Sequence, residues 1–418
     1  MVKSDIKDIK LAPFGKRKIE WAFSQMKVLQ SIQTRFKEEK PLKDVTIAAC
    51  LHVTSETANL AIALKSGGAN VFLAASNPLS TQDDVAASLV SDFDIPTFAI
   101  KGEDNKTYYK HLNAVLDEKP QVTMDDGADL VSLLHSERKS QLKDVYGSSE
   151  ETTTGVIRLK AMEKSGALKI PVIAVNDSLT KHMFDNRYGT GQSTVDGIIR
   201  TTNILLAGKK VLVCGYGWCG RGVASRLRGM GANVAIAEVD PLKALEALMD
   251  GFVVRKISDA LKDNDLVVTA TGNKHVIDTS HLKFMKDGII IANAGHFNVE
   301  FDYDGFVKQA SKKRELRPFL EELTISGKKI FVLGEGRLIN LVSAEGHPPD
   351  VMDMSFANQA FAAQFLIKNA GELAVKVHKL PDDIDREIAR LKLETMGIEI
   401  DKLTANQKKY LESWTEGT

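Results

Sequence analysis

Cysteine is scarce in this sequence, with three residues in 418, and none stands at the spacing of a zinc or disulfide motif. We therefore expect neither a disulfide framework nor a metal site. No stretch approaches the roughly 18 consecutive apolar residues of a membrane-spanning helix, and the charged N-terminus lacks the apolar run of a signal peptide. These absences predict a soluble, cytoplasmic protein.

Net charge is also missing, because 55 Lys and Arg residues balance 55 Asp and Glu residues. Without a global field, the chain has no general attraction for nucleic acid or acidic membranes. We therefore expect neither nucleic acid nor a membrane as its partner, and the site residues discussed below point to a small molecule instead. The length allows two or three domains, each with its own buried core.

The first half of the chain alternates short apolar runs with helical patterns, which predicts a parallel sheet covered by helices. Helices are expected at 55–68 and 80–93. An amphipathic helix at 193–208, with Ser193 and Asp196 as its capping pair, would carry the chain into a second unit. The expected strands lie at 44–50, 69–76, 95–100, 121–126 and 169–177.

The second half repeats this rhythm and is typical of a doubly wound dinucleotide-binding domain. Its expected strands lie at 209–215, 233–240, 265–272, 288–295 and 329–336. The predicted fold is therefore α/β, with two doubly wound domains and a small helical C-terminal arm. The predicted parts are a substrate domain, a Rossmann NAD domain, a return segment that completes the substrate domain, and an oligomerisation arm, at 1–189, 190–345, 346–380 and 381–418.

The stretch VLVCGYGWCGRG contains a Gly-x-Gly-x-x-Gly motif at Gly215, Gly217 and Gly220, between an expected strand and an expected helix. Such glycines permit a tight turn, close approach of the backbone to a pyrophosphate, and close helix packing. Glu238 ends the next strand, where it can accept the ribose hydroxyls of an adenosine. Because this carboxylate would repel a 2′-phosphate, the motif favours NAD over NADP, with nearby Lys243 as the one contrary sign.

Two further strands of this domain end in small residues followed by a polar one, in TATGN at 269–273 and NAGHF at 293–297. Ligands of doubly wound folds lie at the carboxyl ends of the strands. His296 is therefore a candidate for the nicotinamide side of the crevice, although a lone histidine is also compatible with packing inside a loop.

Polar side chains also follow the expected strands of the first domain. A lysine, several carboxylates and a histidine suit a site that binds the vicinal hydroxyls of a sugar and moves protons. Structural alternatives exist: Thr54 to Glu56 can cap a helix, Asp126 can form a turn with Gly127, and the threonine run can form a sheet edge. The candidates are His52, Thr54, Glu56, Asp125, Asp126, Glu150, Glu151, Thr152, Thr153, Thr154, Asn176, Lys181, Asp185 and Asn186.

Nine segments, in order along the chain, carry a resemblance to a known family. They are LHVTSETA, STQDD, DDGAD, SEETTTG, NDSLTKHMFDNRYG, GYGWCGRG, NAGHFNVE, GEGRLINL and GHPPDVM. Over residues 45–380 the sequence closely resembles the S-adenosylhomocysteine hydrolases. The resemblance implies a two-domain subunit, one tightly bound NAD per subunit, and a homotetramer, with a dimer left open.

The resemblance also implies a reaction, the reversible hydrolysis of S-adenosyl-L-homocysteine to adenosine and L-homocysteine in the methyl cycle of one-carbon metabolism. NAD takes hydride from the ribose C3′ carbon, which acidifies the C4′ proton. The thiol then leaves by β-elimination, water adds, and the hydride returns.

Residue roles follow from the same match. Lys181 and Asp185 are expected to hold the ribose hydroxyls, and Lys181 to remove the 3′-hydroxyl proton, which requires a lowered pKa. Asp126 would exchange the C4′ proton, while His52 and His296 would serve the thiol, the water and the oxyanion. The expected substrate contacts are Thr54, Glu56, Asp126, Glu151, Lys181, Asp185 and His347. The expected NAD contacts are Thr152, Thr153, Thr154, Asn186, Gly215, Gly217, Trp218, Cys219, Gly220, Arg221, Gly222, Glu238, Asn273, Ala294, Gly295, His296, Asn340 and His347.

Three features depart from the usual family pattern. The loop reads Gly-Trp-Cys-Gly-Arg-Gly in place of Gly-Asp-Val-Gly-Lys-Gly, Thr190 stands where many members have cysteine, and the sequence ends without the Lys and Tyr tail of longer members. The retained glycines predict that phosphate binding is kept, and Thr190 argues against an obligatory thiol there. Contact of the C-terminal arm with a neighbour's NAD site is left open.

Alternatives for the function also stay open. Glu56 can accept from the amino group of adenine or from the N1–H of hypoxanthine, so an inosyl thioether is a second possible substrate. An NAD-dependent dehydrogenase that releases NADH and a non-catalytic NAD-binding regulator are the rival functions. Two domains with a site between them predict hinges, at 180–192 and 341–352, that close over the substrate.

Overall fold

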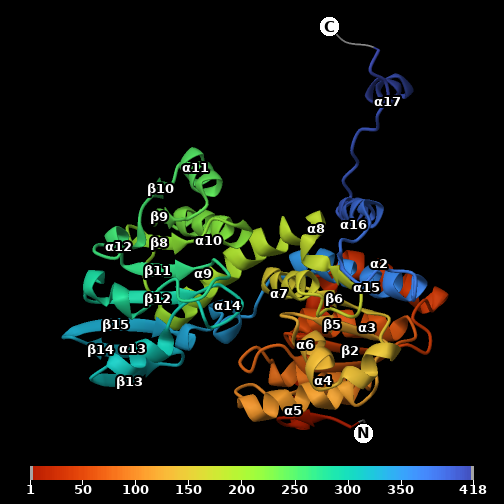
Figure 1. Ribbon diagram of the computed structural model, residues 1–418, viewed down its shortest axis with the longest axis horizontal. Helices are drawn as coiled ribbons and strands as arrows, with labels where there is room; N and C mark the ends of the chain where they lie inside the picture. Colours follow the sequence, from red (N-terminus) through yellow and green to blue (C-terminus); the bar gives the residue numbers. More distant parts are fainter. Residues whose placement is uncertain (1–2, 416–418) are drawn as a thin grey trace.

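The structure is a computed structural model that describes residues 3–415. Two α/β domains lie side by side, joined by α9 (Thr190–Thr202) and by the segment that returns before α15 (Pro349–Lys368) (Figure 1). The predicted fold class of two doubly wound domains with a helical C-terminal part is confirmed. No helix among the described residues is long and apolar enough to cross a membrane.

The first domain is built on an eight-stranded parallel sheet in the order β1-β4-β3-β2-β5-β6-β7-β16. The order runs outward in both directions from β2, which creates a crevice at the carboxyl ends of the central strands. The strands are β1 (Asp5–Ile6), β2 (Thr46–Leu51), β3 (Asn70–Ala75), β4 (Thr97–Ala99), β5 (Val122–Asp125), β6 (Gly147–Glu150), β7 (Val172–Ala174) and β16 (Val377–His378).

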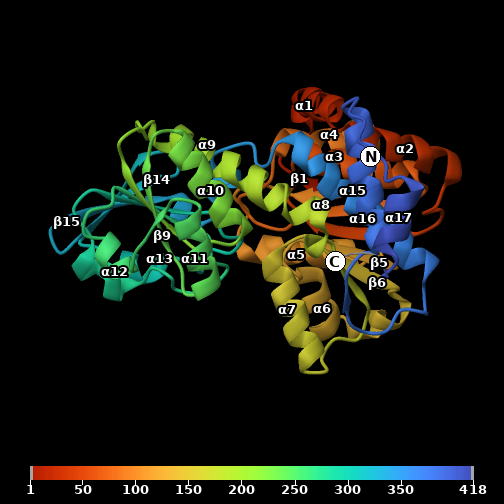
Figure 2. The same ribbon diagram turned by 90° about the horizontal axis from the view of Figure 1, so that it is seen from above.

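Helices cover both faces of this sheet, so most of its strands are apolar on both sides. Ile47, Ala49 and Leu51 of β2 pack in one buried cluster, while Ala48 and Cys50 pack in the other. The first face carries α1 (Ala12–Gln25), α2 (Lys27–Glu39), α3 (Ser55–Ser66), α4 (Asp83–Phe93) and α15, and the second carries α5 (Asn105–Leu116), α6 (Asp129–Ser136) and α7 (Thr153–Lys164) (Figure 2). The four-residue helix α8 (Leu179–His182) follows β7.

Strand β6 is a central strand that the hydrophobic pattern does not predict, because its sequence GSSE is small and polar. All four residues are buried. A Cβ at Gly147 would lie 2.6 Å from the side chain of Leu366 and 2.8 Å from the carbonyl oxygen of Pro171, so only glycine fits beneath α15. The threonines that follow begin α7, so the alternative of a sheet edge at 152–154 is wrong.

The second domain has the sheet order β10-β9-β8-β11-β12-β15-β14-β13. The first six strands are parallel in the doubly wound order. The antiparallel hairpin β14–β13 was not predicted, and its outer strand KKRELR is fully exposed and charged, as is usual for a protected sheet edge. The strands are β8 (Lys210–Cys214), β9 (Asn233–Ala237), β10 (Val253–Val254), β11 (Leu266–Thr269), β12 (Ile289–Asn293), β13 (Lys312–Arg317), β14 (Leu320–Ile325) and β15 (Lys328–Leu333). Its helices are α10 (Trp218–Gly229), α11 (Pro241–Met249), α12 (Ile257–Ala260), α13 (Tyr303–Gln309) and α14 (Ile339–Val342).

The helix that links the two domains begins earlier than predicted. A π-helical turn over Asp185–Gly189 passes directly into α9 at Thr190, so Ser193 lies inside the helix and donates its hydroxyl to the carbonyl of Gly189 at 2.8 Å. The predicted capping pair of Ser193 and Asp196 is therefore wrong. The helix also ends at Thr202 rather than at 208, because Asn203 adopts the left-handed conformation.

The C-terminal segments return to the first domain. Helix α15 packs against α2, α3, α8 and β6, and β16 pairs with β7. Helix α16 (Asp382–Thr395) packs on α15 and α2. Helix α17 (Ala405–Leu411) projects away from the body (Figure 1).

Candidate active site

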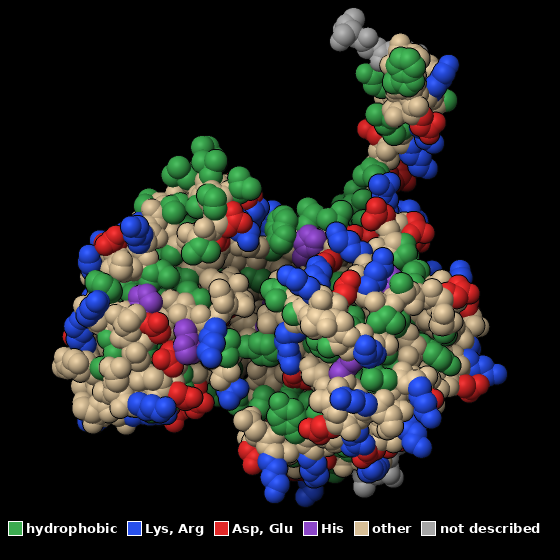
Figure 3. Space-filling view, in the orientation of Figure 1, with side chains coloured by type: hydrophobic (Ala, Val, Ile, Leu, Met, Phe, Trp, Pro, Cys, Tyr) green, Lys and Arg blue, Asp and Glu red, His purple; other side chains and the backbone are tan. Residues whose placement is uncertain are grey.

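A cavity of about 1100 Å³ lies between the two domains, at the carboxyl ends of the strands of both sheets. Figure 3 shows the surface hollowed between the two domains. The volume is at the upper end of the range for small-molecule sites, which suits a dinucleotide together with a second ligand. The predicted residues that line it are His52, Thr54, Asp126, Glu151, Thr152, Thr153, Thr154, Lys181, Asp185, Asn186, Gly215, Gly217, Trp218, Cys219, Arg221, Glu238, Asn273, Ala294, Gly295, His296, Asn340 and His347.

The glycine loop has the geometry that a pyrophosphate needs. Gly215 has φ of +101°, and a Cβ at Gly220 would lie 2.0 Å from the carbonyl oxygen of Gly215, so the loop folds back tightly on the start of α10. A Cβ at Gly217 would meet nothing within 4 Å, because this residue faces the open cavity. Gly217 also starts α10 without a side-chain cap, which leaves the helix N-terminus free for an anion. These features fit a bound dinucleotide.

Glu238 is held rigidly at the end of β9. Its carboxylate accepts hydrogen bonds from the backbone N–H groups of Tyr216 at 2.7 Å, Val239 at 2.7 Å and Asp240 at 3.1 Å. The bond from Tyr216 ties Glu238 to the glycine loop, so the pyrophosphate and ribose positions are set together. Lys243 also lines the cavity, 3.9 Å from a carboxylate oxygen of Asp240.

A buried charge cluster lies on the first-domain side of the cavity. The Lys181 Nζ atom is 2.8 Å from Asp185 Oδ2 and 3.5 Å from Glu151 Oε1, and it donates to Asn186 Oδ1 at 2.9 Å. His347 Nδ1 pairs with the other oxygen of Asp185. The lysine therefore reaches the cavity as a cation among three oxygen acceptors.

The expected lowering of the Lys181 pKa is wrong for this arrangement. Burial works against the charge, but Asp185 and Glu151 outweigh it and hold the pKa of Lys181 above its ordinary value. Burial likewise works to raise the pKa of Asp185, but Lys181 and His347 outweigh it and hold that pKa well below its ordinary value. The pair is thus a buried cation and a buried anion.

Glu151 behaves differently from its neighbours. Burial raises the pKa of Glu151 to about 7, against the opposing charge of Lys181. Two residues of α15 hold the carboxyl in place, since Gln359 Nε2 donates to it at 2.6 Å and the Ser355 hydroxyl donates to its other oxygen. This carboxyl can therefore take up or release a proton near neutral pH, beside Lys181. Sequence reasoning missed both α15 residues, which lie some 200 positions away from Glu151.

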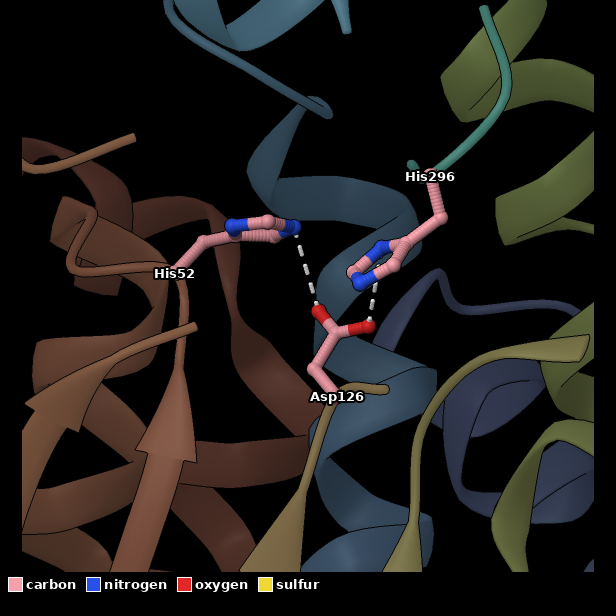
Figure 4. A group of neighbouring side chains, drawn as sticks. All are labelled: His52, Asp126 and His296. Atoms are coloured by element: carbon pink, nitrogen blue, oxygen red, sulfur yellow. Dashed lines mark ion pairs between the residues drawn. The ribbon is translucent and has the colours of Figure 1, made fainter. Parts of the chain in front are cut away.

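The second cluster brings residues of both domains together (Figure 4). The Asp126 carboxylate lies between His52 and His296, with Oδ2 3.2 Å from His52 Nε2 and Oδ1 3.5 Å from His296 Nδ1. Burial lowers the pKa of His52 to about 4, and Asp126 opposes this only in part, so His52 is neutral at neutral pH. Ser80 and Ser76 approach the other ring nitrogen of His52 at 2.7 and 3.1 Å. The three groups also have ligand atoms within 4.8 Å of one another, the spacing of a metal site.

Some predicted residues lie outside the cavity lining, namely Glu56, Asp125, Glu150, Asn176, Gly220 and Gly222. A Cβ at Gly222 would lie 1.8 Å from the carbonyl oxygen of Arg187, so this glycine permits close packing of α10 on the linking segment. Glu56 is buried in the first turn of α3. Thr54 caps this helix, as the structural alternative predicted, and it also lines the cavity. Burial raises the pKa of Glu56.

The cavity also has apolar walls that the sequence analysis did not single out. Met352 and Phe356 of α15 line it, together with Leu338 and Leu341 of the second domain. Their signal was an apolar helical pattern, which predicts a core residue equally well.

The two cavity thiols are poor nucleophiles, since burial raises the pKa of Cys219 to about 11 and that of Cys214 further.

A doubly wound cofactor domain faces a second doubly wound domain that presents paired ionisable groups. Together they define a two-domain enzyme that binds a nicotinamide dinucleotide and acts on a second small molecule in the same cavity.

Comparison with known sequences identifies the family. Residues 3–145 match the family described as S-adenosyl-L-homocysteine hydrolase, and residues 186–346 match its NAD-binding domain. Proteins named adenosylhomocysteinase are similar over the whole length. That of Aquifex aeolicus is 60% identical over 99% of both chains, that of Thermosynechococcus vestitus 59% over 100% of this chain and 97% of its own, and that of Saccharolobus solfataricus 58% over 99% of both. The chain belongs to the S-adenosyl-L-homocysteine hydrolase family.

Proposed function

We propose that this enzyme uses NAD to hydrolyse S-adenosyl-L-homocysteine reversibly to adenosine and L-homocysteine. The observation that carries the proposal is the presence in one cavity of three elements: the glycine loop, the Lys181–Asp185 pair and the His52–Asp126–His296 cluster. The similarity to adenosylhomocysteinases over the full chain supports the same activity.

NAD fits the second-domain side of the cavity. The glycine loop and the N-terminus of α10 would hold the pyrophosphate, Glu238 the adenosine ribose, and the polar groups at 271–273 and 294–296 the nicotinamide half. When bound, NAD supplies the acceptor for the C3′ hydride and the donor that returns it.

The Lys181 cluster would bind the ribose hydroxyls. Asp185 remains an anion and can accept from them, while Lys181 donates to the 3′-oxygen and stabilises negative charge as its proton leaves. Because Lys181 is itself protonated, a proton taken from the hydroxyl needs another acceptor. Glu151, 3.5 Å from Lys181 and with a pKa of about 7, is placed to take that proton through the lysine.

The His52–Asp126–His296 cluster would carry out the proton transfers at the substrate carbon C4′ and at the incoming water. Once C3′ is a ketone, the C4′ proton is acidic enough for a carboxylate such as Asp126 to remove. Neutral His52 can accept the proton of the incoming water, and His296 approaches the same carboxylate from the cofactor domain. Because the cluster is shared between the domains, their relative position governs its geometry.

One experiment separates this function from a dehydrogenase. Purified protein is given the adenosyl thioether, and adenosine, homocysteine and the absorbance of reduced nicotinamide are followed together. The hydrolase forms many equivalents of both products while reduced nicotinamide never exceeds one per subunit. A dehydrogenase would instead release reduced nicotinamide in step with its product, and a non-catalytic regulator would form neither.

Adenine is the favoured base. Proteins similar to this chain over its whole length are named adenosylhomocysteinase, which supports adenine, whereas Glu56 lies outside the cavity lining and does not discriminate between adenine and hypoxanthine here. Parallel assays of the adenosyl and inosyl thioethers test this, and faster turnover of the inosyl form would reject it.

A second copy of this chain is the proposed protein partner, in a homotetramer or a dimer. The projecting arm exposes a row of apolar residues, and α11 and its flanks beside the NAD cavity expose another. Two such surfaces on one chain can bury each other in a symmetric assembly. The arm residues are Ile398, Ile400, Leu403, Tyr410, Leu411 and Trp414, and the second set is Val239, Leu242, Leu245, Leu248, Met249 and Val253.

Deletion of the arm after residue 395 tests this assembly. The deletion should lower the mass measured by sedimentation and weaken NAD retention, whereas an unchanged mass would reject a role of the arm in assembly. The cytoplasmic location expected from the sequence stays a prediction.

A further inference from the structure

The helix that carries Lys181 is too short to hold itself in place. Helix α8 has four residues, and its N-cap residue Ser178 makes no side-chain cap. The first backbone N–H groups of a helix have no partner within it, so they need one from elsewhere. In such a short helix these groups decide whether the turn forms at all.

Asp385 of α16 supplies these missing partners from about 200 residues away. Its Oδ2 atom accepts from the backbone N–H of Leu179 at 2.6 Å, and its Oδ1 atom accepts from the N–H of Thr180 at 2.9 Å. The Thr180 hydroxyl donates to the same carboxylate. Asp385 is 8% exposed and Thr180 4%, so water does not compete readily for these bonds.

Two further contacts fix the position of α8. Asn358 of α15 donates to the Thr180 hydroxyl oxygen at 2.8 Å. At the other end, the ring of His182 lies 5.6 Å from the ring of Trp218 in the glycine loop. The helix is therefore held between α16 and the cofactor loop, and Lys181 projects from its centre.

We propose that Asp385 is a positioning residue for the reaction, acting as the external cap that orients Lys181. The proposal rests on the proposed function only for the role of Lys181, and the capping itself is independent of it. It also means that helix α16, after which the projecting arm begins, sets the geometry of the ribose-binding cluster.

The test compares Asp385→Asn with Asp353→Asn. An asparagine keeps the shape, but it lacks the charge and one of the two acceptor atoms. Asp353 is the matched control, because it is also buried, accepts from the two backbone N–H groups of Val28 and Leu29 at the start of α2, and pairs with Lys392 of α16, so it also reports on general loosening of α16. Helix α2 contributes no residue to the cavity.

The readouts are the steady-state constants and the emission of Trp218. The background is the full chain with Trp21→Phe and Trp414→Phe, which leaves Trp218 as the one tryptophan of the sequence. We expect Asp385→Asn to lower kcat by about 10- to 100-fold, because small misplacements of a reacting group cost this much. KM should change less than kcat, and the Trp218 emission should shift as His182 moves.

Asp353→Asn should lower the melting temperature without shifting that emission or changing kcat beyond about twofold. If Asp385→Asn behaves in the same way, the proposal is overturned. A shifted emission together with an active Lys181→Ala enzyme would support the capping and reject the proposed role of Lys181.

Thr180→Val serves as a second variant should Asp385→Asn fail to fold. It removes the hydroxyl bonds to Asp385 and from Asn358 but leaves both backbone bonds. A smaller loss of kcat with an emission shift in the same direction supports the proposal, and an unchanged emission overturns it.

Discussion

The two domains have the same doubly wound strand order, yet the residues that follow their strands differ in kind. In the first domain, β2, β5 and β6 are followed by His52, Asp126 and Glu151. In the second, β8 and β12 are followed by Gly215 and by Ala294 and Gly295. Directly after these strands the first domain thus presents ionisable groups, whereas the second presents small residues after β8 and β12, with Glu238 after β9 as an exception.

This difference gives the two sides of the site different tasks: one binds the dinucleotide and the other transfers protons. Small residues, with a positive φ at Gly215, let a large dinucleotide approach and offer backbone N–H groups to its phosphates. Buried ionisable groups instead hold one another in altered charge states, which proton transfer requires. Four substitutions test this division, from the largest expected effect to the smallest.

Lys181→Ala removes one of the ionisable groups that the first domain contributes to the site. It removes the cation that faces the ribose, so kcat should fall by about 10²- to 10⁴-fold while NAD stays bound. Hydrolysis rates and NAD content, measured on the same preparation, check this. Lys160→Ala is the matched control, since Lys160 pairs with Asp177 on the surface. Loss of NAD along with activity would contradict a role confined to the ribose.

Gly220→Ala disturbs the glycine loop that the second domain contributes to the dinucleotide site. The new Cβ would lie 2.0 Å from the carbonyl oxygen of Gly215, so the loop must open and phosphate hydrogen bonds are lost. At about 1.5–3 kcal/mol for bonds to a charged group, NAD should bind about 10- to 100-fold more weakly. Gly229→Ala in the same helix meets nothing within 4 Å and should bind NAD normally. Titration of the cofactor-free proteins measures both, and equal affinities would argue against a phosphate site.

Glu238→Ala sharpens the comparison, because Glu238 is an ionisable group that directly follows a strand of the cofactor domain. Loss of its bond to the ribose should weaken NAD by about tenfold. Removal of its negative charge should also narrow the difference between NAD and NADP. Affinities for both dinucleotides give the ratio, and an unchanged ratio would assign the discrimination to other residues.

The smallest expected effect is on the pH dependence of stability, and Glu151→Gln tests it separately from the loss of activity expected on removal of the proton acceptor. The folded pKa of Glu151 is raised from 4.5 to about 7, so between these values the folded state binds more protons than the unfolded state. Stability from this group is therefore present below about pH 4.5 and is lost as the pH rises to about 7. The Gln variant should lack this decline in denaturant unfolding, whereas exposed Glu20→Gln should retain it. A decline of equal size in all three proteins would remove Glu151 as its cause.

Much of the fold could be predicted because most strands of both sheets are buried on two faces and read as apolar runs, as β2 and β8 do. Strand β6 could not, since its neighbours and α15 demand small residues rather than apolar ones. The hairpin of β13 and β14 was missed for a related reason, because its outer strand is exposed and charged.

The sequence predicted many residues of the candidate site, but not how they contact one another or which charge states they adopt. His52, Asp126 and His296 each follow a strand end, and that position alone made them candidates. Their meeting across two domains depends on how the sheets face each other. The partners of Glu151 and the cap of α8 come from the returning C-terminal helices, where no motif points to them.

The sequence by itself determined the two doubly wound domains, the dinucleotide loop and the residues at the strand ends, because apolar periodicity and glycine spacing act over a few neighbouring residues. The tertiary structure alone decided that Lys181 is a cation and that Glu151 can exchange a proton near neutral pH. A pKa depends on burial and on charges a few ångströms away through space. Glu151 and Lys181 come from separate segments of the chain, and Ser355 and Gln359, which bind Glu151, come from some 200 residues further along, so only the folded arrangement brings these groups together.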